Sequence, residues 1–300
     1  MKVSSDVYDV SMMIEAIKEV QAVLNAKKYG TFSELDAEVA KTLNPYAPYG
    51  DGFERFRMSL TKDAASSSDL QKSCTQMNLL CERRIEDCEC SQKDQINDIL
   101  PFIRNTSRII VHGSGKLLAL AIACSIQEHE GVRFFICEGR PSRKSCPNGS
   151  GEALLESILE TPEGLRLKDK IREYCVIIPD SGVASIMNNV DFIIMGAYCV
   201  TEHGGLVHST GSFQVATVAC SRNVPCYVLC ETFKFSHIFP LGTEDLEQPA
   251  ESTSVVPLVE FVPPSMISLI FSEKGIMPPS AVADEMFRFH TAPLAAWKNK

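Results

Sequence analysis

The sequence has no uninterrupted apolar run that approaches the roughly 20 residues needed to span a bilayer. Its opening stretch, MKVSSDVYDVSMM, lacks the apolar core of a secretory signal peptide, so we expect a cytoplasmic protein with no membrane partner. Positive charge is also scarce, because 29 Lys and Arg face 38 Asp and Glu, for a formal net charge of −9. Nucleic-acid binding by counterion release needs clustered positive charge. We therefore expect protein or small-molecule partners and no direct contact with nucleic acid.

Cysteine is abundant, with 12 in 300 residues, but no CxxC pair or matching histidine spacing is present. Without a signal peptide, these thiols are expected to stay reduced and to serve mainly as small apolar side chains. Cys74, Cys81 and Cys88 are seven residues apart and should lie along one helical face. Cys90 adds a C-x-C pair, which leaves zinc as an alternative, but the spacing favours no metal site.

The periodicity of the apolar residues changes near residue 105. Before it, apolar residues at three- and four-residue intervals predict helices over 12–24, 32–43 and 67–90, and a further helix that starts near residue 53. Thr31 and Glu34 have the spacing of a capping box at the start of the second helix. The sequence therefore predicts a helical domain over 1–105 and a second domain over 106–300.

After residue 105, short apolar and β-branched segments alternate with helix-length segments. The predicted strands cover 108–112, 134–137, 175–178, 190–195, 226–230 and 256–262, and the crossover helices cover 117–126, 153–174, 183–187 and 213–222. Right-handed crossovers of this length build a mostly parallel sheet that is covered on both faces. We expect an α/β protein, with an amino-terminal helical domain followed by a Rossmann-like, mostly parallel sheet domain.

A glycine-containing turn follows the first predicted strand. It consists of His112, Gly113, Ser114, Gly115 and Lys116, and it lies where backbone amides and the helix dipole favour an anion. The run is neither a Walker loop nor a complete GxGxxG motif. Two interpretations stay open: a binding turn for a phosphate-bearing ligand, or a tight strand-to-helix turn without a ligand.

Three more polar residues follow predicted strands and are expected near the carboxyl edge of the sheet. Arg140 can hold a phosphate while Glu138 orients its guanidinium group, although a purely structural pair would have the same sequence. Asp180 is interpreted as the cap of a helix that begins near Ser181, in preference to a catalytic acid. Lys234 is placed either in the cleft or at an interface.

An apolar cluster follows the fifth predicted strand and is a candidate interface, because obligate interfaces bury large apolar areas. Its members are Phe233, Phe235, Ile238, Phe239 and Leu241. Ordinary core is the alternative interpretation, since clustered apolar residues do not show which side faces a partner.

Five segments occur in an order that resembles one known family. They are IIVHGSGK, FFICEGRPS, PDSGVASIMNNVDFIIMGAYCVTEHGGLVHSTGS, CETFKF and PPSMISLIFSEKGIMPPSAVADE, and together they extend over about 190 residues from Arg108 onward. The family contains the alpha, beta and delta regulatory subunits of eukaryotic translation initiation factor 2B and two sugar-phosphate isomerases. The carboxyl-terminal run and the chain length are most similar to the alpha branch.

The resemblance also shows which chemistry is missing. The isomerases of the family carry a cysteine after the histidine of the first motif and an aspartate after Gly-Ala in the third, and here Gly113 and Tyr198 stand at these positions. Glycine has no thiol, and a phenol with a pKa of about 10 is a poor substitute for a carboxylate in proton transfer. We therefore expect no catalytic residue. The dipeptide that begins at His208 replaces the Asn-Lys of the isomerases, whereas Arg140 and Lys234 match, which leaves room for a non-catalytic sugar-phosphate or nucleotide ligand.

The resemblance implies a regulatory, non-enzymatic subunit that needs no cofactor. Such a subunit forms a homodimer, joins beta, delta, gamma and epsilon subunits in the guanine-nucleotide exchange complex, and helps to sense initiation factor 2 phosphorylated on its alpha subunit. The sensing contact is expected on the helices before Arg104. Two alternatives stay open: a sugar-phosphate isomerase with an altered active site that uses Cys199 or Glu202, and a stand-alone dimer that binds a phosphate metabolite.

Overall fold

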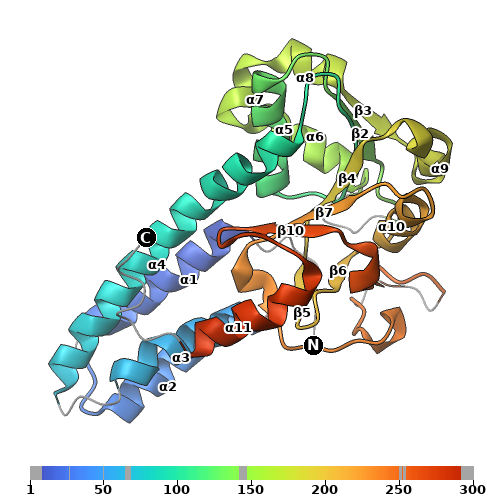
Figure 1. Ribbon diagram of the computed structural model, residues 1–300. Helices are drawn as coiled ribbons and strands as arrows, with labels where there is room; N and C mark the ends of the chain where they lie inside the picture. The colour runs from blue at the N-terminus through green and yellow to red at the C-terminus, as the bar shows by residue number, and fades with distance from the viewer. Residues whose placement is uncertain are drawn as a thin grey trace.

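A computed structural model describes residues 9–26, 28–49, 51–64, 69–141, 147–249, 252 and 255–291 of the chain. Four helices come first: α1 (Val10–Asn25), α2 (Phe32–Leu43), α3 (Gly52–Ala64) and α4 (Leu70–Ile99), with a 3-10 turn at Asn44–Tyr49. Figure 1 shows α1, α2 and α3 beside the long α4, so that the four helices form an arm that projects from the sheet.

Side-chain caps define where these helices begin. The predicted capping box at α2 is confirmed: Thr31 Oγ1 accepts a hydrogen bond from the Glu34 amide, and the Glu34 carboxylate accepts one from the Thr31 amide, both at 3.3 Å. Asp9 caps α1 by accepting from the amides of Ser11 and Met12 at 2.9 and 3.3 Å. Each cap satisfies amides that the helix itself leaves without a partner.

The cysteines of α4 lie along one buried face, as their spacing predicted. Cys81 and Cys88 are buried in the core of the helical arm, and Cys74 packs against that core while partly exposed. Burial raises the pKa of Cys81 to about 12, so this thiol is protonated and packs as an apolar group. The described ranges contain no group of three or more His, Cys, Asp or Glu that could hold a metal ion.

Helix α4 extends beyond its predicted end and joins two cores. Its last turns place Ile96 and Ile99 in the core of the sheet, whereas Met77 and Cys81 belong to the core of the arm. The sequence pattern ended at residue 90, and the helix continues to residue 99 because apolar residues return on the face that meets the sheet. The division into domains near residue 105 stays a prediction, since one helix contributes to both cores.

The main sheet confirms the predicted Rossmann-like, mostly parallel architecture. Seven described strands have the order β11-β10-β7-β4-β1-β2-β3, and every neighbouring pair is parallel except β10 with β11. The strands are β1 (Arg108–His112), β2 (Arg133–Cys137), β3 (Cys175–Ile178), β4 (Phe192–Met195), β7 (Cys226–Leu229), β10 (Leu269–Ser272) and β11 (Gly275–Met277). The connecting helices are α5 (Lys116–Glu128), α6 (Ser150–Glu160), α7 (Pro162–Arg166), α8 (Lys168–Tyr174), α9 (Val183–Ile186) and α10 (Ser212–Ser221), and α11 (Val282–Thr291) follows the last strand. No helix in the described part of the chain is both long and apolar enough to cross a membrane.

A second, smaller sheet was not predicted. It contains β5 (Cys199–Thr201), β6 (Leu206–Ser209), β8 (Phe235–Ser236) and β9 (Val259–Val262), in the order β8-β5-β6-β9. The segment 256–262 was predicted as a strand of the main sheet, but residues 259–262 pair antiparallel with β6 instead. The strands of this sheet have only two to four residues, too short for an alternating pattern to be recognised.

The predicted crossover helix over 153–174 is three helices. Thr161 ends α6, and Pro162 begins α7 because proline has no amide hydrogen to continue the preceding helix. The Thr161 hydroxyl then accepts a hydrogen bond from the Gly164 amide at 2.9 Å, which caps α7. One Thr-Pro dipeptide thus divides a continuous apolar pattern.

The helical arm docks on the segment that follows β7. Phe233 is buried in the core of the arm, and the guanidinium group of Arg55 donates to the carbonyl oxygens of Thr232 and Phe233 at 3.0 and 3.1 Å. Gly52 lies so close that a Cβ atom there would be within 3 Å of the Phe233 carbonyl oxygen. The start of α3 therefore needs glycine because another part of the backbone occupies the side-chain position.

Substituting this glycine tests the docking. Gly52→Ala should lower the free energy of unfolding by roughly 1–3 kcal/mol, the cost of overpacking a tight contact. Gly182→Ala is the matched control, because the nearest atom to its Cβ would be 3.5 Å away, an ordinary contact, and its change should stay within about 0.5 kcal/mol. Urea unfolding followed by circular dichroism measures both, and equal stabilities would contradict the proposed contact.

Candidate functional site

The turn after β1 is built around two glycines. Gly113 and Gly115 have φ values of +92° and +155°, a region that favours glycine, and they lead the chain into α5 at Lys116. The Lys116 ammonium group pairs with Asp9 Oδ2 at 3.0 Å and donates to the Ser11 hydroxyl at 2.8 Å. The lysine predicted to meet a phosphate is therefore held by the first turn of α1.

Three aromatic rings pack together where β1 and β6 end, at the position of the expected cleft. His112 from β1 and His208 from β6 are 0 % and 1 % exposed, and their ring centroids are 5.7 Å apart in an edge-to-face arrangement. The Tyr198 ring lies against His208 with a centroid separation of 4.7 Å. A Cβ atom on Gly196 would lie 3.7 Å from the Ser114 carbonyl oxygen, so the chain that leads from β4 to Tyr198 lies beside the turn after β1.

Each buried imidazole lies against a glycine. A Cβ atom on Gly113 would come within 3 Å of His208 Nε2, and one on Gly211 would come within 3 Å of His112 Nε2. Real Cβ atoms essentially never show such separations. The His208 ring therefore occupies the space that a cysteine side chain would need at position 113.

The environment of His112 keeps its imidazole neutral. Burial is the largest influence and lowers the pKa of His112 to about 4, against opposing effects of the Asp180 charge and of the backbone at Thr210. A neutral imidazole offers a phosphate no positive charge. His112 acts here as a packed ring and not as an anion-binding cation.

Asp180 does not cap a helix, so that prediction is wrong. Its two carboxylate oxygens accept hydrogen bonds from the amides of Gly139 and Arg140, at 3.0 and 2.8 Å. The neighbouring strands β2 and β3 end side by side, which brings the amides after β2 to the carboxylate after β3. The guanidinium group of Arg140 pairs with Glu138 at 2.5 Å and donates to the Asn148 carbonyl oxygen at 3.3 Å, so Glu138 does orient it.

Lys234 is a buried member of an ion pair. Its ammonium group lies 2.9 Å from Glu231 Oε2, and the two side chains are 9 % and 2 % exposed. Burial acts to lower the pKa of Lys234, but the charge of Glu231 and smaller contributions from other groups, Asp9 included, outweigh it and raise the pKa. Lys234 is thus a charged group with a close internal partner, and it is not placed at an exposed surface.

Two carboxylates of the site were missed by sequence reasoning. Glu260 Oε2 accepts hydrogen bonds from the amides of Gly211 and Phe213, at 2.9 and 3.1 Å, at the amino terminus of α10. Asp9 is the other, through its contact with Lys116. A lone Glu within the apolar stretch VEFV was the available signal for Glu260, whereas nothing in the sequence connected Asp9 with position 116.

The candidate interface residues separate into two groups. Phe233 and Phe235 are 6 % and 0 % exposed and belong to the core, the alternative interpretation for this cluster. Ile238 packs against a small core of the second sheet, while Phe239 and Leu241 are 64 % and 85 % exposed. Only Phe239 and Leu241, of these five, present large apolar surfaces to solvent.

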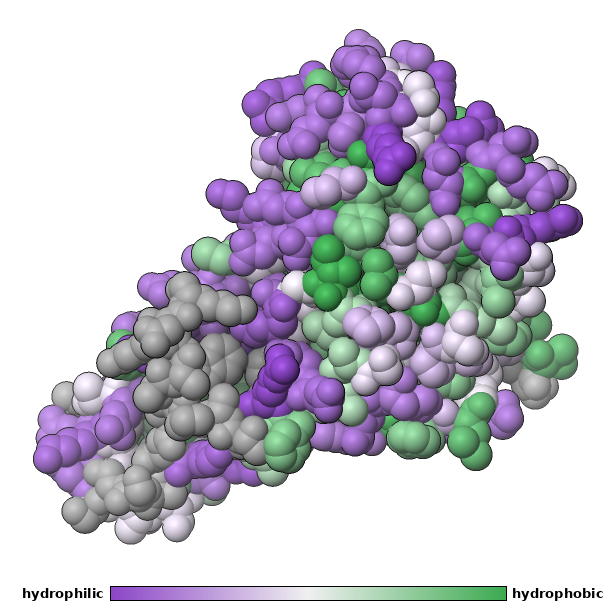
Figure 2. Space-filling model, in the orientation of Figure 1, coloured by the Kyte–Doolittle hydropathy of each residue, from purple (hydrophilic) through white to green (hydrophobic). Residues whose placement is uncertain are grey.

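Apolar residues also gather elsewhere on the sheet domain. Figure 2 shows hydrophobic residues grouped over the middle of the face turned to the viewer, where β7 and β10 lie in Figure 1, between helices with hydrophilic surfaces. Ile276 of β11 contributes an exposed apolar side chain at the edge of the sheet. Contiguous apolar surface of this kind marks protein contact sites.

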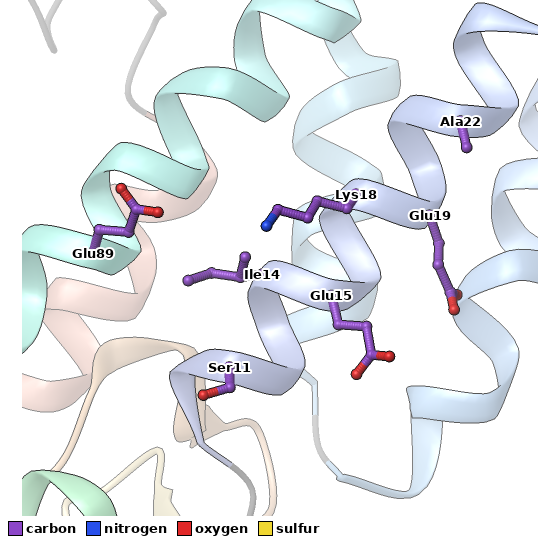
Figure 3. Close-up of a pocket in the computed structure, with 7 residues that line it drawn as sticks. All are labelled: Ser11, Ile14, Glu15, Lys18, Glu19, Ala22 and Glu89. Carbon is purple, nitrogen blue, oxygen red and sulfur yellow. The ribbon is translucent and has the colours of Figure 1, made fainter.

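A groove lies on α1, on the side of the arm where α4 passes. Its volume is about 660 Å³, and its lining consists of Ser11, Ile14, Glu15, Lys18, Glu19 and Ala22 of α1 together with Glu89 of α4. In Figure 3, Ile14 and Lys18 extend toward α4, while Glu15 and Glu19 point away from it. The residues that line the groove carry three carboxylates and one ammonium group, so their formal charge is negative.

Comparisons with known proteins found one family model and several sequence relatives. Residues 169–279 match the model described as "Initiation factor 2 subunit family". The chain is 30 % identical over 211 residues to the translation initiation factor eIF2B subunit alpha of Dictyostelium discoideum and 27 % identical over 199 residues to that of Caenorhabditis elegans. Each alignment covers 63 % of this chain and 60 % of the relative, so the chain spans less than two thirds of the relatives' length.

The chain also matches an isomerase in sequence and several solved structures in fold. A ribose 1,5-bisphosphate isomerase of Methanocaldococcus jannaschii is 23 % identical over 193 residues, which covers 59 % of this chain and 56 % of the enzyme. The tetrameric eIF2B-beta2-delta2 complex from C. thermophilum matches with a TM-score of 0.71 at 14 % identity, covering 95 % of this chain and 91 % of the matched chain. The Pyrococcus horikoshii OT3 translation initiation factor eIF-2B matches at 0.64 and 17 % identity, covering 93 % and 94 %. At these identities the structural likeness shows the fold.

The contact between Gly113 and His208 is testable by a double-mutant cycle. Gly113→Ala should lower the free energy of unfolding by roughly 2–5 kcal/mol, from the strain of a left-handed backbone and from the clash with the imidazole. In a His208→Ala background the clash is gone, so the same change should cost only about 1–2 kcal/mol. Urea unfolding of the four proteins gives the coupling, and an equal cost in both backgrounds would show that the ring does not fill this space.

The depressed pKa of His112 predicts a loss of stability in acid. In the unfolded chain His112 binds a proton below about pH 6.5, whereas in the folded chain it stays neutral down to about pH 4. Its contribution to the free energy of unfolding is therefore complete above pH 6.5 and is lost as the pH falls from 6.5 to 4. At about 1.4 kcal/mol per pH unit, the contribution is about 3 kcal/mol. Unfolding free energies from pH 7 to 4 should fall less steeply for His112→Phe, which keeps a ring at the site. Parallel profiles would exclude His112 as the cause.

Proposed function

We propose that this chain, which carries a domain of the initiation factor 2 subunit family, is a non-catalytic regulatory subunit of the alpha type in a translation initiation factor 2B complex. The single observation that carries the non-catalytic part is the His208 ring packed against Gly113. In the isomerases that the sequence resembles, a cysteine stands at position 113. Here that position has no side chain, and its space holds another residue.

The remaining candidates for chemistry in the cleft are unsuitable. Cys199 is 2 % exposed, and burial raises its pKa to about 12, so it is a neutral thiol and a poor nucleophile. Glu202 lies at the surface and contacts His237 Nδ1 at 3.2 Å. These positions argue against an isomerase that uses Cys199 or Glu202 in place of the missing residues.

The partners follow from the same proposal. The chain forms a homodimer in the cytoplasm and joins beta, delta, gamma and epsilon subunits, and it helps to detect initiation factor 2 phosphorylated on its alpha subunit. The exposed Phe239 and Leu241 offer apolar surface for subunit contact. The sensing contact was expected on the helices before Arg104, and the acidic groove on α1 lies on these helices. It offers a charged, hollowed surface to which the initiation factor can bind.

The proposed function requires no cofactor. It includes binding of a phosphate-bearing metabolite that the chain does not convert. Lys116 is the most accessible cation of the cleft, with a side chain that is 60 % exposed. Arg140 is 51 % exposed and already paired with Glu138, and Lys234 is buried against Glu231. A sugar phosphate or nucleotide would therefore meet Lys116 first.

Recovery of the complex from cells tests the proposal. Affinity purification of the tagged chain in mild salt, followed by mass spectrometry and a size measurement, should recover beta, delta, gamma and epsilon subunits. A Phe239→Asp, Leu241→Asp double variant should lose at least half of this recovery, because a buried charge at an apolar interface is costly. Leu165→Asp is the matched control, since Leu165 is 59 % exposed on α7, outside the proposed surface. Recovery of the chain alone, as a dimer, would contradict the proposed assembly and favour the alternative of a stand-alone dimer that binds a phosphate metabolite.

A further inference from the structure

The groove on α1 is lined by charged side chains that the chain itself leaves unpaired. In Figure 3, Lys18 extends from α1 toward Glu89 of α4 with Ile14 beside it, whereas Glu15 and Glu19 point away from α4. Within the described residues, none of these four charged groups makes a side-chain hydrogen bond or an ion pair. The carboxylates of the groove are therefore available to cations from outside the chain.

Elsewhere on the arm, charged side chains do find partners. The guanidinium group of Arg57 lies 2.7 Å from a carboxylate oxygen of Asp36 on α2 and 2.7 Å from one of Glu54 on α3. These pairs join neighbouring helices of the arm or turns of one helix, so their charges are compensated within the chain. The groove differs, because its three carboxylates outnumber its one ammonium group and stay uncompensated.

The dimensions of the groove suit a short peptide segment. Its lining runs from Ser11 to Ala22, a length of about 16 Å at the rise of an α-helix, which matches about five residues of an extended chain. Its volume of about 660 Å³ is within the range of ordinary ligand sites. Ile14 packs against the core of the arm and also lines the groove, so it presents an apolar contact between the charged side chains.

The charges of the groove also determine what it rejects. A phosphoryl group on a side chain carries about −1.5 to −2 charges at neutral pH and is repelled beside Asp or Glu. Lys18 is the one cation among the lining residues, and Glu15 and Glu19 lie one turn or less from it on the same helix. The groove therefore favours positive segments and disfavours the same segments once they are phosphorylated.

We propose that the groove on α1 is a docking site for a basic, unphosphorylated segment of a partner protein, in which Lys or Arg side chains pair with Glu15, Glu19 and Glu89 while an apolar side chain covers Ile14. The inference rests on the proposed function, in which these helices contact initiation factor 2, and it adds the chemistry of the segment that binds here. A phosphoryl group within the docked segment weakens the contact, so the phosphate that the subunit detects is recognised outside this groove.

Fluorescence anisotropy of a labelled peptide, titrated with the full chain, tests the docking. The probe is a peptide of Arg-Leu-Ser repeats. Glu15→Gln with Glu19→Gln should weaken its binding about two- to tenfold, because two exposed charge contacts are lost. The matched control is Glu156→Gln with Glu160→Gln, the same charge change at two exposed glutamates one turn apart on α6, and it should leave the affinity unchanged. Ala22→Lys places a cation at an exposed position of the groove and should abolish the binding.

Two altered peptides test the charge selection. Replacing Arg by Glu throughout the peptide should abolish binding, and phosphorylation of its central Ser should weaken binding about threefold at low salt, with a smaller difference as salt is added. The inference is overturned if the Glu15→Gln, Glu19→Gln variant binds the Arg peptide as tightly as its α6 control does. Equally tight binding of the phosphorylated peptide, or no binding of the Arg peptide to the wild-type chain, would overturn it as well. None of these measurements involves the other subunits, so failure of the docking site is distinguishable from failure of the proposed assembly.

Discussion

The carboxyl edge of the parallel sheet imposes the constraint on which the rest of the site depends. Strand ends and helix starts converge there, and they present unpaired backbone amides and cations that favour an anion. In this chain internal carboxylates meet that need: Asp180 accepts from the amides after β2, Glu260 accepts from the start of α10, and Asp9 pairs with Lys116. The edge is thus electrostatically satisfied by the protein itself. These amides therefore have hydrogen-bond acceptors within the chain and need no external anion.

Two buried imidazole rings fill the space beside these carboxylates. The imidazoles of His112 and His208 occupy the middle of the cleft, and the glycines at 113 and 211 are what make room for them. Neither ring can be kept if a side chain is placed on its glycine, so the absence of a cysteine at 113 and the presence of histidine at 208 are one packing solution. Placing a cysteine at position 113 would therefore also require repacking of the His208 ring.

Sequence reasoning succeeded where a local rule acts. The capping box at Thr31, the parallel strands around Val111 and the buried cysteine face of α4 all follow from spacing and side-chain type. It failed where the deciding partner is distant in the chain. Asp180 is a residue type that commonly caps helices, but its carboxylate accepts from the amides of Gly139 and Arg140, which precede it by 41 and 40 residues. Residues 259–262 were predicted as a further strand of the main sheet, but they pair antiparallel with β6. The contact between Asp9 and Lys116 spans more than 100 residues and involves common surface residue types, so no pattern announces it.

Helix α4 joins the arm to the sheet because it contributes to both cores. Its first half packs in the arm and its last turns pack under the sheet, so the arm is not a free appendage. The arm is further clamped by Arg55 on the carbonyl oxygens of Thr232 and Phe233. The first turn of α1 is attached to the start of α5 by the contacts of Lys116 with Asp9 and Ser11. Three contacts therefore fix the arm on the sheet domain: the shared helix α4, the hydrogen bonds of Arg55 and the ion pair of Lys116 with Asp9.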